Sequence, residues 1–194
     1  HKGFVAFDFP LNVFSSSISW SETNKSDTKI YISPSIHWKH DLSPFWRLKI
    51  LGSLDDDLDN SIMYSDSILT NYRTWVNPSE RFGWKHLSSL LFSVNYANFI
   101  TMFTWNLTAS ASWRKTDYHN QYSYEERYTV ITPIWADTHS HMFLIQTSVD
   151  KTFTQIGFSA KGTVNYTRNI LPVTQNNVQQ TVKSNILSPS MKLR

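Results

Sequence analysis

Few residues of this chain have types and spacings that could do chemistry. The densest cluster is the acidic run Asp55-Asp56-Asp57-Leu58-Asp59, whose carboxylates are ligands of the kind that Ca²⁺ prefers. The run lacks the glycine and the distal glutamate of an EF-hand loop. We therefore predict a solvated loop here rather than a calcium site.

Two histidine pairs suggest a metal site. His139 and His141 would share one face of a strand, and His37 lies three residues before His40. The sequence places no carboxylate or third histidine to complete either set, and the absence of cysteine excludes thiolate sites and disulfides. We predict interfacial or loop histidines, with no metal and no cofactor.

Sequence signatures of catalysis are absent. The chain has no Gly-x-Ser-x-Gly elbow, phosphate loop, dinucleotide fingerprint or His-Glu-x-x-His motif. We predict no catalytic residues and a protein that is not an enzyme.

Segment 55–85 combines aromatic residues with arginines, which suits recognition of a sugar or peptide by stacking and hydrogen bonding. It equally suits a loop that packs on itself. The ligand-binding candidates are Tyr72, Arg73, Trp75 and Trp84, with Tyr64, Arg81 and Phe82 in the same segment.

The clearest structural element is residues 103–116, where apolar and polar residues alternate strictly. Alternation with a period of two predicts a long strand with one apolar and one polar face. Trp105 and Trp113 lie near the ends of the apolar side. At about 3.3 Å per residue and a tilt of roughly 40°, the rings are about 20 Å apart along a barrel axis. This is close to the height of a lipid-facing band between aromatic girdles.

The same alternation recurs along the chain and predicts an all-β fold of about eight long strands. Segment 123–136 is also strand-like, and we place it in a hairpin outside the spanning strands. The predicted strands are 4–14, 30–40, 45–54, 87–97, 103–116, 141–153, 156–168 and 182 to the end.

Short and long connections alternate between these strands. Residues 41–44, 98–102 and 151–155 would form tight turns, and aromatic residues flank them; the long connections are 16–28, 55–85, 118–140 and 169–181. Such sorting is typical of an antiparallel up-and-down β-barrel, or part of one. Pro34 and Pro189 occupy similar Ser-Pro-Ser sequences, and we expect an equivalent bend at both.

Composition agrees with this interpretation. Charged residues are 17% of the chain, against roughly 25% in soluble domains, while 40% are hydrophobic and eight are tryptophan. No segment approaches the ~20 apolar residues of a membrane helix, although barrel strands escape such a search. The net charge of +3 comes from scattered Lys and Arg, so we expect no nucleic-acid partner.

Three short motifs resemble Bacteroidota outer-membrane β-barrel proteins of the TonB-dependent receptor type: Phe9-Pro10-Leu11-Asn12, Ser33-Pro34-Ser35 and Val149-Asp-Lys-Thr-Phe153. The resemblance implies a barrel of about 22 strands, an N-terminal plug and a TonB box, and uptake of bulky nutrients. The sequence contains neither plug nor TonB box, and it lacks a terminal aromatic residue. We therefore expect residues 1–194 to be a single barrel segment of a larger protein.

The resemblance also implies an outer-membrane location. The expected partners are the lipid bilayer, an unidentified small nutrient and, through the parent chain, TonB and a surface lipoprotein.

Two alternatives remain open. One is a soluble, secreted all-β barrel or sandwich that binds a ligand and buries the apolar face inside. That fold predicts more Lys and Glu on the polar face and no sorting of loop lengths. The other is a small, closed eight-stranded membrane barrel.

Overall fold

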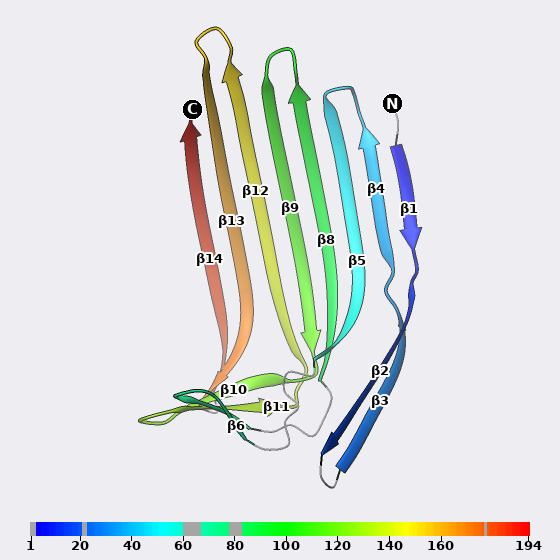
Figure 1. Ribbon diagram of the computed structural model, residues 1–194, viewed down its shortest axis with the longest axis vertical. Helices are drawn as coiled ribbons and strands as arrows, with labels where there is room; N and C mark the ends of the chain where they lie inside the picture. The colour runs from blue at the N-terminus through cyan, green and yellow to red at the C-terminus, as the bar shows by residue number, and fades with distance from the viewer. Residues whose placement is uncertain (1–2, 21–22, 60–66, 78–82, 177) are drawn as a thin grey trace.

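A computed structural model describes residues 1–194 except 1–2, 21–22, 60–66, 78–82 and 177. In these described residues the chain is all-β and contains no helix, which confirms the predicted class (Figure 1). Eight strands form one antiparallel array and pair in the order β1, β4, β5, β8, β9, β12, β13, β14. They are β1 (Gly3–Asp8), β4 (Ser35–Asp41), β5 (Trp46–Asp59), β8 (Gly83–Asn98), β9 (Phe103–Thr116), β12 (Thr138–Phe153), β13 (Phe158–Gln175) and β14 (Val178–Leu193).

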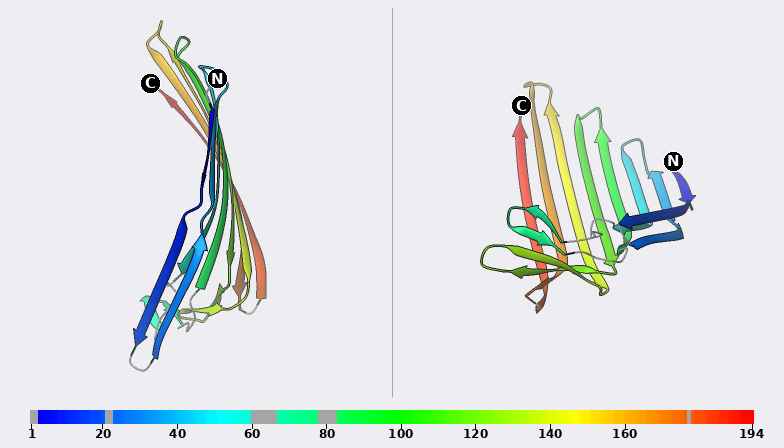
Figure 2. Two further views of the ribbon diagram at one scale, coloured as in Figure 1. Left: turned by 90° about the vertical axis from the view of Figure 1, so that its right-hand side faces the viewer. Right: turned by 60° about the horizontal axis from the view of Figure 1, so that its bottom comes forward.

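The array is twisted and open (Figure 2). β1 pairs only with β4, and β14 pairs only with β13, so two edges are unpaired among the described residues. The complete sheet also contains parallel pairs, between β10 and β13 and between β11 and β7. Closure into an up-and-down antiparallel barrel therefore remains a prediction.

Four short strands lie together at the end of the array opposite its tight turns (Figure 1). β10 (His119–Tyr124) and β11 (Thr129–Ile134) form a hairpin, as do β6 (Ile68–Asn71) and β7 (Thr74–Val76). The hairpin predicted around 123–136 is thus present, beginning a few residues earlier. We call this end of the molecule the loop end and the other the turn end.

Several predicted connections differ from the structure. The tight turns near 41–44, 98–102 and 151–155 are present, but 169–181 is not a long loop, because β13 and β14 stay paired as far as Gln175 and Val178. Residues 16–20 and 23–28 likewise belong to the paired strands β2 (Leu11–Trp20) and β3 (Thr23–Ile32). Backbone pairing can continue past the point where side-chain alternation ends, and alternation was the only signal for strand length.

The acidic run is also strand rather than loop. Residues 55–59 form the last part of β5 and pair with residues 83–87 of β8. Asp56 accepts a hydrogen bond from Lys29, and the Nδ1 atom of His86 lies 2.5 Å from its carboxylate. The ion pair with Lys29 and the ladder hydrogen bonds to β8 stabilise this acidic segment within the sheet.

The two Ser-Pro-Ser segments are not structurally equivalent. Pro34 lies in the break between β3 and β4, opposite the break at Pro10, while the register on either side of the breaks is unchanged. Pro189 instead lies within β14, opposite Val164. A proline is tolerated there because β14 is an edge strand, where one side needs no ladder donor. The predicted common bend is wrong.

Candidate functional site

The strand registers gather the apolar residues on one face of the array, which we call the apolar face. One continuous ladder row contains eight of them, one from each strand. These residues are Val5, Trp38, Ile50, Phe92, Ala109, Ile145, Tyr166 and Leu187. Since side chains alternate along each strand, the apolar parities found in the sequence combine into a single surface.

No described element covers this surface. Phe7 is 61% exposed, Ile145 44% and Leu187 65%. Among the described residues the buried hydrophobic side chains are only Leu58, Val94 and Tyr118. Contiguous exposed apolar surface of this extent marks contact with a protein or a membrane. The array has no hydrophobic core of its own.

Aromatic rings are clustered on the apolar face near the turn end. Trp46 lies 4.7 Å from Tyr96 and 5.8 Å from Trp105 between ring centroids, and Phe153 lies 6.0 Å from Phe158. The indole nitrogen of Trp105 donates a hydrogen bond to the hydroxyl of Thr147 at 3.0 Å. This contact satisfies two polar groups on an otherwise apolar surface.

A second aromatic pair lies towards the loop end, and charged residues follow it. Trp113 and Phe143 meet edge to face at 6.2 Å. Two residues beyond Trp113 towards the loop end, Lys115 lies on the same face of β9. Its ladder row also contains Asp56, His86 and His139. Between the two aromatic groups, the apolar face of β8 and β9 carries no Asp, Glu, Lys or Arg, whereas on β12 Lys151 lies on this face, opposite Phe103.

The stretch of apolar residues on the apolar face, which we call the apolar band, runs diagonally to the rows of directly opposite residues. Phe7 and Ile36 share a ladder row with Leu90, and the same row continues to Arg168 and Asn185 on β13 and β14. That row lies inside the apolar stretch on β1 and β4 but beyond it on β13 and β14. A level band on tilted, staggered strands has this geometry.

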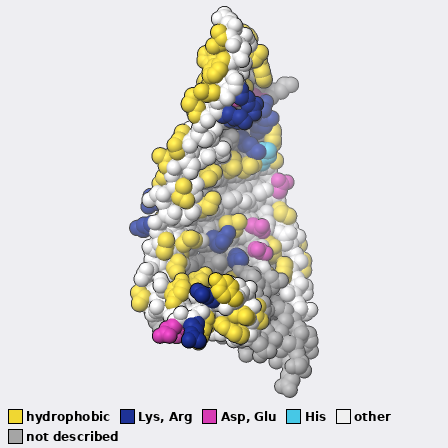
Figure 3. Space-filling view, turned by 60° about the vertical axis from the view of Figure 1, so that its left-hand side comes forward, with side chains coloured by type: hydrophobic (Ala, Val, Ile, Leu, Met, Phe, Trp, Pro, Cys, Tyr) yellow, Lys and Arg dark blue, Asp and Glu magenta, His cyan; other side chains and the backbone are white. Residues whose placement is uncertain are grey.

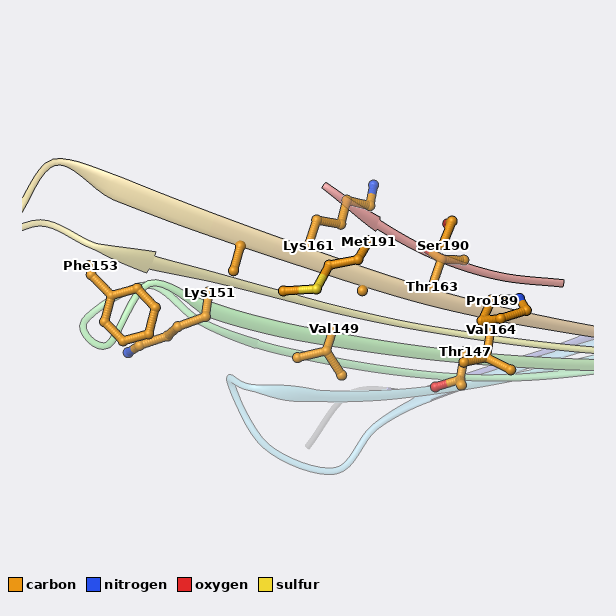
Figure 4. A pocket seen from close by; sticks show the side chains of 12 residues that line it. Thr147, Val149, Lys151, Phe153, Lys161, Thr163, Val164, Pro189, Ser190 and Met191 are labelled. Carbon is orange, nitrogen blue, oxygen red and sulfur yellow. The ribbon is translucent and has the colours of Figure 1, made fainter. Parts of the chain in front are cut away.

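A shallow groove interrupts the apolar face at Gly162 (Figure 4). Val149 and Met191 flank this glycine on the neighbouring strands, and the groove has a volume of about 610 Å³. A Cβ atom built on Gly162 would meet no heavy atom within 4 Å.

The opposite, polar face carries many small hydrogen-bonding residues, together with charged side chains and with leucines such as Leu51 and Leu91. Ser53 and Ser89 share a hydrogen bond of 2.7 Å, and the side-chain amide of Asn95 donates to that of Asn106. Serines occupy adjacent strands in one ladder row, at positions 35, 53, 89 and 112.

The four predicted ligand-binding residues are divided between two places. Tyr72 and Arg73 form the turn between β6 and β7, with the guanidinium carbon 5.1 Å from the tyrosine ring centroid, and Trp75 follows in β7. Trp84 lies near the start of β8, where it contacts Phe14 and lies 4.3 Å from the ammonium of Lys29. Tyr64, Arg81 and Phe82 lie outside the described residues.

The histidines do not assemble a metal site in the described part of the chain, where no group of three potential ligands occurs. His37 and His40 occupy opposite faces of β4, whereas His139 and His141 share one face of β12, opposite Lys115 and Trp113.

His119 had no sequence signal but links the loop-end hairpin to the array. Its two ring nitrogens lie 3.2 Å and 2.8 Å from the hydroxyls of Thr138 and Thr174. These partners are distant in the sequence, so only the folded chain reveals the contact.

Comparison with models of known protein families, with curated proteins and with solved structures finds no match to this chain. Among the described residues, no helix is long and apolar enough to cross a membrane.

Proposed function

We propose that this chain forms part of the wall of an outer-membrane β-barrel of the TonB-dependent receptor type. Its apolar face contacts lipid, and its polar face lines the lumen. The protein takes up a nutrient or binds a ligand at the cell surface, and this segment carries no catalytic role. The observation that supports the proposal is the uncovered apolar band between two aromatic groups.

The physical argument rests on what can cover such a band. Water would leave several large apolar side chains solvated at a cost of about 25 cal/mol per Å² of apolar surface. Lipid removes that cost, and Trp and Tyr favour the two interfaces because each ring has an apolar body and a polar atom. The diagonal course of the band supports tilted strands, as in membrane barrels.

The receptor type rests on the resemblance of the short motifs around Pro10, Pro34 and Asp150. In this proposal TonB and a surface lipoprotein act through the parent protein. Nutrient contacts would come from the loop end, where the exposed Tyr72 and Arg73 lie on a hairpin turn.

Lipid exposure can be tested with vesicles that contain brominated phospholipids, which quench tryptophan fluorescence on contact. We expect quenching that falls when Trp105 and Trp113 are replaced by phenylalanine. If the protein is instead folded and monodisperse in buffer without detergent, the proposal fails. A soluble ligand-binding barrel or sandwich would then be the better interpretation.

A further inference from the structure

Two lysines lie directly opposite one another on the polar face. Lys39 of β4 pairs in register with Lys49 of β5. Directly opposite side chains have Cβ atoms about 5 Å apart, and like charges in this position destabilise a sheet. Within the described residues neither lysine has an ion-pair or hydrogen-bond partner. An anion bound between them would remove this repulsion.

A third cation extends the pair towards the turn end. Arg47 lies on the same face of β5 as Lys49, two residues away. Its Nε atom donates to Asp41 at 2.9 Å, yet its side chain remains 56% exposed. Asp41 is thus the carboxylate that lies among the three cations. Asp8 is farther away, because it pairs with Ser35, four residues from Lys39 on β4.

Neutral donors and a hollow lie beside these cations. Ser93 is opposite Lys49, and Asn95 is opposite Arg47. A depression of about 510 Å³ next to the lysine pair is lined by Arg47 and its partner Asp41, by Asn95 and by residues of the β4–β5 turn, while the two lysines lie outside its lining. His37 lies on the same face and has a buried Nε2 atom that lacks a partner among the described residues. Figure 3 shows Lys and Arg side chains gathered in the upper part of the molecule, close to a histidine.

We propose that Lys39, Lys49 and Arg47 form a binding site for a small dianion, a phosphate or dicarboxylate group. The lysines act as point charges on either side of the anion, and the guanidinium can offer paired donors. This site goes beyond the proposed function. It rests on the registers of β4, β5 and β8, and not on which face meets lipid.

The test uses inorganic phosphate as the probe. The protein is kept in octyl glucoside at constant ionic strength, and binding is measured by isothermal titration calorimetry. We expect Lys39→Gln and Lys49→Gln each to weaken phosphate binding about tenfold, since each removes one charged contact. Lys183→Gln, on β14, is the matched control and should leave binding unchanged. Succinate in a parallel titration separates dicarboxylate from phosphate preference.

A second variant distinguishes binding from repulsion alone. Lys49→Glu places a carboxylate opposite Lys39, so it should raise thermal stability and abolish phosphate binding. The proposal is overturned if the wild-type protein binds neither anion at millimolar concentration. Equal weakening by Lys183→Gln, or phosphate binding retained by Lys49→Glu, would also overturn it. None of these three outcomes bears on lipid contact, which the quenching experiment measures separately.

Discussion

The two faces of the eight-strand array share one backbone but differ in the surroundings that stabilise them, since one face is apolar and the other is polar. On β9, Ala109 belongs to a row of eight apolar residues, while its neighbour Ser110 points to the opposite side. The polar face supplies hydrogen-bond partners within itself at contacts such as Ser53 with Ser89, although among the described residues the Nε2 atom of His37 has none. The apolar face finds no partner among the described residues. A sheet can thus form the hydrogen-bond ladders between its strands and still leave one face without the apolar surroundings that this face requires.

The largest expected effect is the loss of stability when a charge is placed on the apolar face. Ala109→Arg should destabilise the protein by about 2–4 kcal/mol if the apolar face meets lipid, because a cation would enter the hydrocarbon region. Ser110→Arg is the matched control and should be mild. Denaturant unfolding in vesicles gives both values. Equal costs at the two positions would break the distinction between the faces.

A smaller effect is expected at the polar contact within the apolar face. Trp105→Phe leaves the Thr147 hydroxyl without its donor, so we expect a loss of about 1 kcal/mol. The double variant with Thr147→Val should recover most of this loss, because both polar groups are then gone. The same unfolding assay measures it. No recovery would mean that the indole ring contributes through packing alone.

The glycines of the apolar face give a still smaller effect of opposite sign. Gly162→Val should stabilise the sheet by a few tenths of a kcal/mol, since the side chain enters open space and valine favours strands. Gly52→Val is the control, because its Cβ would lie 3.0 Å from Ile36 Cγ2 and must displace that side chain. Thermal unfolding compares the two. A loss at Gly162 would show that the groove must stay empty or hold a ligand.

The smallest expected effect is a pH dependence at the loop end, where charged residues replace the apolar band. The hydrogen bond from Lys115 holds the pKa of Asp137 below its ordinary value of 3.8. A lowered pKa in the folded state contributes stability above the ordinary value, and the contribution is lost as pH falls through the folded pKa. We expect a small loss of loop-end protection in hydrogen exchange below about pH 4. Lys115→Gln should remove that pH dependence, and an unchanged profile would contradict the pairing.

Alternation predicted most of the fold, because a period of two reports directly on strands that face two media. It located all eight strands of the array and set the hairpin near 123–136 apart from them, but it missed that the predicted strands 4–14 and 30–40 are each divided in two, at Pro10 and at Pro34. It failed where the strand continues but the alternation stops, as in the acidic end of β5 and in the unbroken apolar run Ile170-Leu171-Pro172-Val173 of β13. There the backbone ladder maintains the strand, and side chains give no sign of it.

The candidate sites were less predictable. Sequence proximity suggested that Trp84 belongs with Tyr72 and Arg73, but the chain carries it to β8 beside Lys29. The Lys39–Lys49 pair had no sequence signal, because its opposition depends on the register across a turn. Contacts set by pairing between strands cannot be read from spacing along one strand.

The diagonal course of the apolar band has a consequence for how such a chain can change. One residue inserted into β9 would exchange its faces beyond that point, and two would keep the faces but move Trp113 out of line with its neighbours. A whole hairpin could be duplicated or removed only if the stagger between its strands and their neighbours were preserved. The stagger thus constrains lengths as strictly as the alternation constrains residue types, and insertions would be tolerated in the connections rather than in the strands.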